Sequence, residues 1–142
     1  MTTLRFTQIT DLHLGPARDS TLVGVRTAES FESVLQAVEQ QGRGSDILLL
    51  TGDLAADCDP EAYQILNQIL IDEGKRAIWL PGNHDNFDLM VTNLVDYPPI
   101  QVKVAGNWAV LTLDSSQPKK PGGHISEAQL EQIAQNLKSH AD

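Results

Sequence analysis

Three short polar clusters in the sequence combine residue types that bind metal ions and move protons. They are Asp11-Leu12-His13, Gly52-Asp53 and Asn83-His84-Asp85. Carboxylate, imidazole and amide groups form a mixed nitrogen and oxygen donor set, which suits Mn, Fe or Zn better than calcium or a structural zinc. Two such ions held close together polarise a phosphate and generate hydroxide at neutral pH. The clusters therefore predict a site for divalent metal ions and phosphate chemistry.

Each of these residues alone has an ordinary structural explanation. Asp11 and Asp53 are residue types that often occupy turns and helix caps, and Gly82-Asn83 is also a common turn pair. His13 lies between two leucines, where a histidine is often packed in the core. The joint placement of all of them, directly after three apolar runs, favours a functional site over separate turns.

The apolar runs span residues 4–9, 46–50 and 76–80, and each ends in one of the polar clusters. Runs of this length are typical of buried strands. A helix is predicted between each pair of strands. The first has Phe31, Val34, Leu35 and Val38 at helical spacing and closes at Gly42, and the second starts at Asp59-Pro60 and ends at Gly74. This alternation predicts an α/β fold with a parallel sheet, whose strand ends open on one edge.

The last third of the sequence predicts a hairpin and a helix. Residues 100–114 read as two strands about a Gly106-Asn107 turn. A helix follows in residues 125–140, with a capping box of Ser126 and Gln129 and a hydrophobic staple of Ile125 and Leu130. Its expected core stripe is Leu130, Ile133, Ala134 and Leu137. We also expect Trp79 and Trp108 in the core.

The composition narrows the class of protein and its partners. A length of 142 residues is most simply a single domain, 1–142. The net charge of −9, from 19 acidic and 10 basic residues, disfavours long nucleic acid as a partner. There is no apolar run of the roughly 20 residues that span a bilayer, and no signal-peptide pattern, so no membrane partner is expected. The single cysteine, Cys58, fits a reducing compartment, and we expect a cytoplasmic protein.

Taken together, the three clusters resemble the motif of the calcineurin-like metallophosphoesterase family. That motif runs Asp-x-His, Gly-Asp and Gly-Asn-His-Asp, and it stands here at Asp11 to His13, Gly52-Asp53 and residues 82–85. Within the family, the flanks QITDLHL, GDLAADCDPEAY and LDSSQPKKPGGHISEAQLEQI are similar to bacterial class III cyclic-nucleotide phosphodiesterases. The resemblance covers essentially the whole chain and implies the N-terminal half of a four-layer αββα sandwich.

The resemblance implies a role for each matching residue. Asp11 and His13 would hold a first metal ion, Asp53 would bridge two ions, and Asn83 would bind the second. His84 would not be a ligand; it would face the substrate phosphate and steady or protonate the leaving oxygen. Asp85 would orient His84 from behind, as a carboxylate commonly does for an imidazole.

The family motif continues with a lone histidine and Gly-His-x-His, which this sequence does not contain. His124 and His140 are the only later histidines, and neither has the family setting. We therefore expect either a fragment or a naturally shortened member of the family. In both cases the chain should hold one ion, or a partial site, and tend to form homo-oligomers through uncovered apolar surface.

The leading hypothesis is a metal-dependent phosphoesterase with a dinuclear site, acting on cyclic nucleotides or other small phosphodiesters. One alternative is a catalytically weak or inactive member that serves as a binding module. A repair-type nuclease is a further alternative, which the acidic charge and the absence of a basic stripe disfavour.

Overall fold

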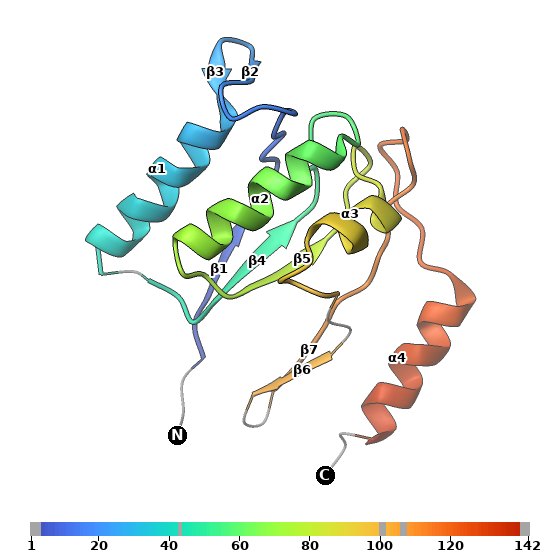
Figure 1. Cartoon of the computed structure of the whole chain (residues 1–142). Helices are drawn as coiled ribbons and strands as arrows, with labels where there is room; N and C mark the ends of the chain where they lie inside the picture. Colours follow the sequence, from blue (N-terminus) through green and yellow to red (C-terminus); the bar gives the residue numbers. More distant parts are fainter. Residues whose placement is uncertain (1–3, 43, 100–101, 106–107, 140–142) are drawn as a thin grey trace.

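A three-stranded parallel sheet forms the centre of the fold (Figure 1). The computed structural model describes residues 4–42, 44–99, 102–105 and 108–139. The strands are β1 (Phe6–Ile9), β4 (Ile47–Thr51) and β5 (Ala77–Leu80), in the order β1-β4-β5. Ile9 pairs with Leu50, and Thr51 pairs with Leu80. The predicted strands and α/β class are confirmed, with strand ends shifted by one or two residues.

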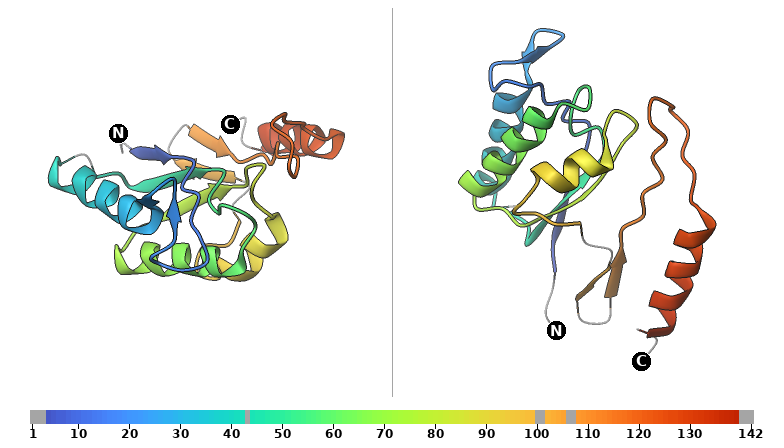
Figure 2. Two further views of the ribbon diagram at one scale, coloured as in Figure 1. Left: turned by 90° about the horizontal axis from the view of Figure 1, so that it is seen from above. Right: turned by 45° about the vertical axis from the view of Figure 1, so that its right-hand side comes forward.

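Three helices cover one face of this sheet (Figures 1 and 2). They are α1 (Thr27–Gln40), α2 (Pro60–Asp72) and α3 (Phe87–Asn93). The first two were predicted, and each closes at the expected glycine, Gly42 or Gly74, both with positive φ. Asp59 occupies the N-cap of α2 as expected, although its side chain makes no capping hydrogen bond.

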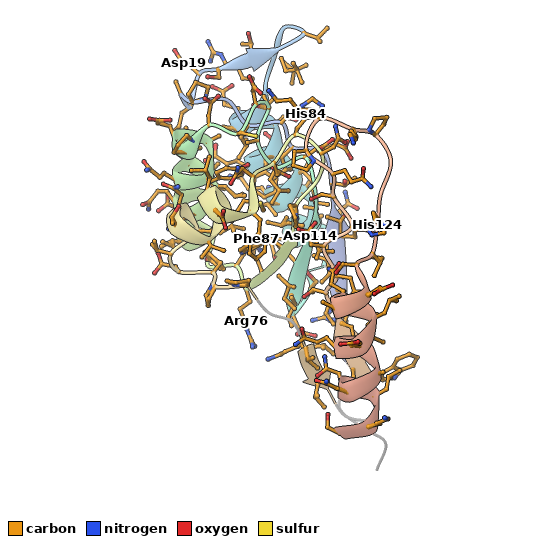
Figure 3. All side chains as sticks on the ribbon, turned by 90° about the vertical axis from the view of Figure 1, so that its right-hand side faces the viewer. Asp19, Arg76, His84, Phe87, Asp114 and His124 are labelled. Atoms are coloured by element: carbon orange, nitrogen blue, oxygen red, sulfur yellow. The ribbon has the colours of Figure 1, made fainter. Side chains whose placement is uncertain are left out.

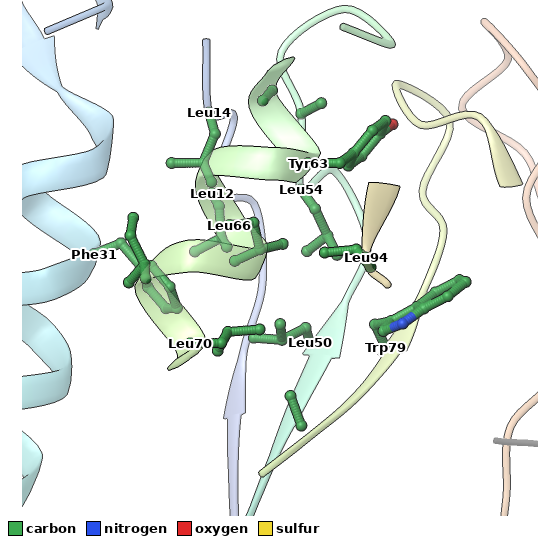
Figure 4. Packing of buried hydrophobic residues seen from close by; sticks show 14 of the residues in the cluster. Leu12, Leu14, Phe31, Leu50, Leu54, Tyr63, Leu66, Leu70, Trp79 and Leu94 are labelled. Carbon is green, nitrogen blue, oxygen red and sulfur yellow. The ribbon is translucent and has the colours of Figure 1, made fainter. Parts of the chain in front are cut away.

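The core lies between the sheet and the two long helices, as Figure 4 shows. Phe31 and Leu35 come from α1, whereas Val34 is 45% exposed, so the predicted stripe of α1 is narrower than its sequence spacing implies. The loops after the strands also enter this core. Its fully buried large side chains are Leu14, Leu35, Leu50, Leu54, Tyr63, Leu66, Ile69, Leu70, Met90 and Leu94. Burial of loop residues matters for the site because it fixes the backbone there.

Three short elements, two strands and a helix, were not predicted from the sequence. A short antiparallel pair, β2 (Thr21–Leu22) and β3 (Val25–Arg26), precedes α1. Helix α3 begins at Phe87, and the side chain of its N-cap residue, Asn86, accepts a hydrogen bond from the backbone N–H of Leu89. Elements this short span too few residues for a hydrophobic period to emerge, so pattern analysis misses them.

The last third of the chain forms a hairpin and a helix that lie beside the sheet. The strands β6 (Val102–Ala105) and β7 (Trp108–Leu111) pair antiparallel, as predicted; the expected turn pair Gly106-Asn107 lies outside the described residues. Helix α4 (Glu127–Ser139) follows, and its capping box is confirmed. The backbone N–H of Ser126 donates to Gln129 Oε1, and the backbone N–H of Gln129 donates to Ser126 Oγ.

The expected burial of this last third is wrong in two places. Trp79 is buried as predicted, but Trp108 is 79% exposed. No residue of α4 is buried, and Leu130 and Leu137 of its predicted core stripe are both more than half exposed. Figure 2 shows the reason, because α4 lies on the opposite side of the molecule from α1 and stands apart from the central sheet. A helical period predicts an apolar face but does not supply the surface that covers it.

Within the described part of the chain, none of the helices has the length and apolar character to cross a membrane.

Candidate metal centre

The three polar clusters lie in three loops at one edge of the sheet (Figure 1). Because β1, β4 and β5 run parallel, their carboxyl ends meet at that edge, which is where open α/β sheets bind ligands. The first two loops continue the strand pairing beyond the strands. The backbone N–H of Asp11 donates to the carbonyl of Gly52 at 3.1 Å, and that of His13 donates to the carbonyl of Asp53 at 2.9 Å. The backbone therefore sets these side chains next to one another.

Asp11, His13 and Asp53 converge into a group that could hold a metal ion. One ligand atom from each lies within 4.8 Å of the others. The Asp11 carboxylate is exposed, while His13 and Asp53 are half-buried. His13 Nε2 lies 3.8 Å from Asp11 Oδ1. Two carboxylates and an imidazole facing one point are a donor set that fits a divalent transition metal ion. Among the described residues, this is the one group of three or more such side chains that comes together.

The backbone at these three residues is in the left-handed region. The φ angles are 57° at Asp11, 44° at His13 and 51° at Asp53. Residues other than glycine rarely adopt this conformation, which costs on the order of 1–3 kcal/mol each, and such strain gathers at functional sites. The fold therefore holds all three candidate ligands in a conformation that local sequence preference alone would not select.

Two glycines allow the second and third loops to approach each other. A Cβ atom at Gly82 would lie 2.1 Å from Asp53 Oδ1 and 2.4 Å from the Asp53 backbone nitrogen. At Gly52, where φ is +96°, a Cβ atom would lie 2.9 Å from the Cα of Gly82. No larger residue fits at Gly82 without displacing Asp53. The glycines that precede Asp53 and Asn83 therefore bring the Asn83-His84 segment against the metal-binding group.

The structure places His84 beside this group. Its backbone N–H donates to Asp53 Oδ1 at 3.1 Å, and its ring stands edge-on to the ring of His13, with 5.2 Å between the centroids. The ring nitrogen Nδ1 lies 3.0 Å from the carbonyl oxygen of Ala56. Because a carbonyl oxygen only accepts hydrogen bonds, Nδ1 carries a proton in this arrangement. The other ring nitrogen, Nε2, is left as the one that can exchange a proton.

Asp85 has a different position from the one that the resemblance implies. Its carboxylate is only 3% exposed. It accepts hydrogen bonds from the backbone N–H groups of Leu54, Ala55 and Gly82 and from the hydroxyl of Tyr63, at 2.8–3.1 Å. Among the described residues, the hydrogen bonds of this carboxylate do not include one to the His84 ring, whose Nδ1 faces the Ala56 carbonyl. The catalytic role of Asp85 stays a prediction. Asp85 ties the second loop to the third and to helix α2.

Sequence reasoning missed two residues that complete this arrangement. Tyr63 donates to Asp85 Oδ1 at 3.0 Å and accepts from the backbone N–H of Asn86 at 3.1 Å. Burial, followed by the negative charge of Asp85, raises the pKa of the Tyr63 hydroxyl. Cys58, also at positive φ, donates from its backbone N–H and from Sγ to the carbonyl of His84. The sequence could have pointed to Tyr63, because its hydroxyl lies on the face of the predicted helix that packs into the core.

The remaining predicted residues are placed as follows. Asn83 is half-buried, and its carbonyl accepts a hydrogen bond from the backbone N–H of Lys119 at 2.9 Å. Its role as a ligand stays a prediction. His124 is exposed on the loop before α4, apart from His84 in Figure 3, and it does not belong to the metal-binding group. His140 lies outside the described residues.

Comparisons with known proteins agree with this geometry. A family model described as calcineurin-like phosphoesterase matches residues 4–138. The 3',5'-cyclic adenosine monophosphate phosphodiesterase CpdA of Escherichia coli (strain K12) is 37% identical over 137 residues, which are 94% of this chain and 50% of that protein. The protein of the same name from Haemophilus influenzae is 33% identical, with the same two shares.

A cyanobacterial relative extends the comparison. The 3',5'-cyclic-nucleotide phosphodiesterase alr5338 of Nostoc is 36% identical over 133 residues, which are 92% of this chain and 50% of that protein. The chain thus spans about half the length of the curated relatives it matches.

Proposed function

The chain belongs to the calcineurin-like phosphoesterase family, and from that premise we propose that it is part of a metal-dependent phosphodiesterase that acts on cyclic nucleotides or other small phosphodiesters. The observation that carries the proposal is the convergence of Asp11, His13 and Asp53, on strained loops, beside the ring of His84. Neither a core histidine nor a turn aspartate needs that arrangement.

The substrate class rests on the relatives and on charge. The similar proteins carry names that specify cyclic nucleotides or cyclic adenosine monophosphate as substrate. The net charge of −9 repels a polyanionic backbone, so a small phosphodiester is favoured over long nucleic acid. A cytoplasmic location fits this substrate class and the single cysteine, Cys58.

The metal assignment follows from the donor groups. Asp11, His13 and Asp53 would hold one ion, and Asp53 with Asn83 would hold a second. When bound, divalent ions polarise the phosphate and lower the pKa of the water that attacks it. Because one group of three ligands comes together among the described residues, we expect this chain to hold one ion firmly and the second weakly. Hydrolysis by the chain alone should then be slow.

We assign His84 as the proton donor to the leaving oxygen. With Nδ1 against the Ala56 carbonyl, the ring is fixed and its protonated form carries a second N–H at Nε2. That N–H would donate to the oxygen that leaves phosphorus. The hydrogen bond from the His84 backbone to Asp53 keeps the ring next to the metal-binding group while it does so.

The proposal is tested by metal-dependent hydrolysis. The purified chain would be freed of metal with EDTA, reloaded with Mn²⁺, and assayed with bis(p-nitrophenyl) phosphate, cyclic AMP and p-nitrophenyl phosphate. We expect slow hydrolysis of the two diesters that appears only with Mn²⁺. Hydrolysis that is unchanged in EDTA, or metal binding without hydrolysis of any phosphate ester, would contradict the proposal. The second result would support a binding module instead.

Exposed apolar residues of the last third favour self-association. Trp108 on β7 and Leu130 and Leu137 on α4 are all more than half exposed. Exposed apolar groups of this kind mark contact surfaces or aggregation sites. We therefore expect homo-oligomers, which light scattering would detect, and a Trp108→Lys, Leu130→Lys variant should shift the distribution towards monomer.

A further inference from the structure

A pocket lies beside the metal centre, on the side of Asn83 and His84. It has a volume of about 320 Å³ and is lined by Asp57, Cys58, Asn83, His84 and Lys119. Lys119 comes from the loop between β7 and α4, far along the chain from the other four. Among the described residues that line the pocket, Lys119 is the only one with a permanently basic side chain. His84 and Lys119 therefore line the same pocket.

The loop that carries Lys119 is held against the site by its backbone. The N–H of Lys119 donates to the carbonyl of Asn83 at 2.9 Å, and the N–H of Lys120 donates to the carbonyl of Gln117 at 2.9 Å. Further along, the N–H of His124 donates to the carbonyl of Ser115, which closes the loop. Lys119 thus has a fixed backbone position next to a residue of the site.

The turn itself holds a lysine where glycine is the usual residue. Residues 117–120 have Pro118 at the second position and Lys119 at the third, with φ +60°. A proline followed by a residue of positive φ is the pattern of a type II turn, whose third position is normally glycine. A side chain at such a position adds strain without improving the turn. A glycine at position 119 should relieve this strain and leave the turn intact.

Lys119 and Asp57 are the two residues of the described pocket lining that carry a permanent charge at neutral pH. The ion pairs among the described residues include Arg5, Arg18, Arg26 and Lys75, but not Lys119. Burial raises the pKa of the Cys58 thiol, and the charge of Lys119, which lines the same pocket, acts against that rise. In a chain of net charge −9, a local cation is what draws an anion into a site.

We propose that Lys119 is a substrate-binding residue, whose ammonium contacts a phosphate oxygen of the phosphodiester that His84 faces. This assignment rests on the function proposed above and names a further residue of that site. A lysine suits this task because its compact charge and three donors bind phosphate oxygens without requiring a fixed fork geometry. Lys120 follows directly in the loop but does not line the pocket.

A glycine substitution in this turn can distinguish an effect on the fold from an effect on phosphate binding. Lys119→Gly removes the ammonium, keeps the backbone N–H that donates to Asn83, and relieves the positive φ. It should therefore melt at the same temperature as the wild type or higher. The matched control is Lys120→Gly, and Lys119→Arg tests rescue by another cation.

The measurement is binding of inorganic phosphate to the Mn²⁺-loaded chain by titration calorimetry, together with steady-state hydrolysis of bis(p-nitrophenyl) phosphate. Losing one hydrogen bond to a charged group should weaken phosphate binding by roughly tenfold or more in Lys119→Gly and raise KM by a similar factor, with kcat less affected. Lys119→Arg should recover most of the affinity, and Lys120→Gly should match the wild type.

The outcomes distinguish this assignment from the function on which it rests. A wild type that binds Mn²⁺ and phosphate, with Lys119→Gly binding phosphate equally well, overturns the assignment alone. An equal loss of phosphate affinity in Lys120→Gly also overturns the assignment, because removal of any positive charge from this loop would then have the same effect. A wild type that binds no Mn²⁺ overturns the proposed function, and the role of Lys119 with it.

Discussion

The buried carboxylate of Asp85 accepts a hydrogen bond from the hydroxyl of Tyr63, with 3.0 Å between the two oxygens. The same carboxylate accepts from the backbone N–H groups of Leu54, Ala55 and Gly82. One side chain therefore joins helix α2 to the loops that carry Asp53 and His84. Backbone hydrogen bonds already join the first loop to the second, as between His13 and Asp53, and the Asp85 carboxylate adds the connection from the second loop to the third and to α2.

Replacing Asp85 by asparagine should destabilise the fold. The amide would set an NH₂ group against N–H donors that now point at carboxylate oxygens, leaving at least one buried donor unsatisfied. We expect a loss of at least about 2 kcal/mol in the free energy of unfolding, measured with urea. Asp88→Asn, at an exposed position of α3, is the matched control and should change little. Equal stability of Asp85→Asn and the wild type would mean that the connection is not needed.

The same pair predicts how stability depends on alkaline pH. Burial and the charge of Asp85 raise the pKa of Tyr63, so the folded state keeps this proton at pH values where the unfolded chain has lost it. Stability from this source is complete below the unfolded pKa of about 10 and falls as pH rises above it. We expect the loss of unfolding free energy from about pH 8 to about pH 11 to be smaller in Tyr63→Phe than in the wild type.

A residual alkaline loss should remain in Tyr63→Phe, because burial also raises the pKa of Tyr97. Identical pH profiles for the wild type and Tyr63→Phe would show that Tyr63 ionises alike in both states.

His84 is expected to act on the reaction and not on metal binding. In His84→Ala, kcat for bis(p-nitrophenyl) phosphate should fall by about 10²–10³, the scale for loss of one positioned donor. The Mn²⁺ content should hardly change, because the ring is held by the Ala56 carbonyl and not by the metal group. His124→Ala is the matched control and should keep full activity. Loss of metal in His84→Ala would make His84 a ligand and reverse the assignment.

The parts of the fold that could be predicted are those that a local pattern encodes. The strands that end before Asp11, Asp53 and Asn83 are apolar runs followed by turn residues, and their order along the chain defines the parallel sheet. This order was sufficient to predict that the three clusters lie at one edge of the sheet. The conformations of Asp11, His13 and Asp53 could not be predicted, because positive φ at these residues goes against local preference and is imposed by the surrounding loops.

What could not be predicted depends on contacts between distant segments. The pairing of Asp85 with Tyr63 and of His84 with Ala56 joins residues more than 20 positions apart. The exposure of Trp108 and of the α4 stripe has the same origin, since the sequence shows an apolar face but not its partner surface. Lys119 was passed over because loop lysines are common and its turn position becomes informative only with φ known.

The most direct test of the metal centre is a Mn²⁺ titration of the wild type beside Asp53→Ala, Asp11→Ala and Asn83→Ala. Asp53 is assigned to both ions and lies between the first and third loops, so its loss should harm binding more than either other change. We predict one firmly bound Mn²⁺ per wild-type chain, weaker binding in Asp11→Ala, little change in this firm ion for Asn83→Ala, and the largest loss in Asp53→Ala. Wild-type affinity in Asp53→Ala, or no Mn²⁺ binding by the wild type, would contradict it.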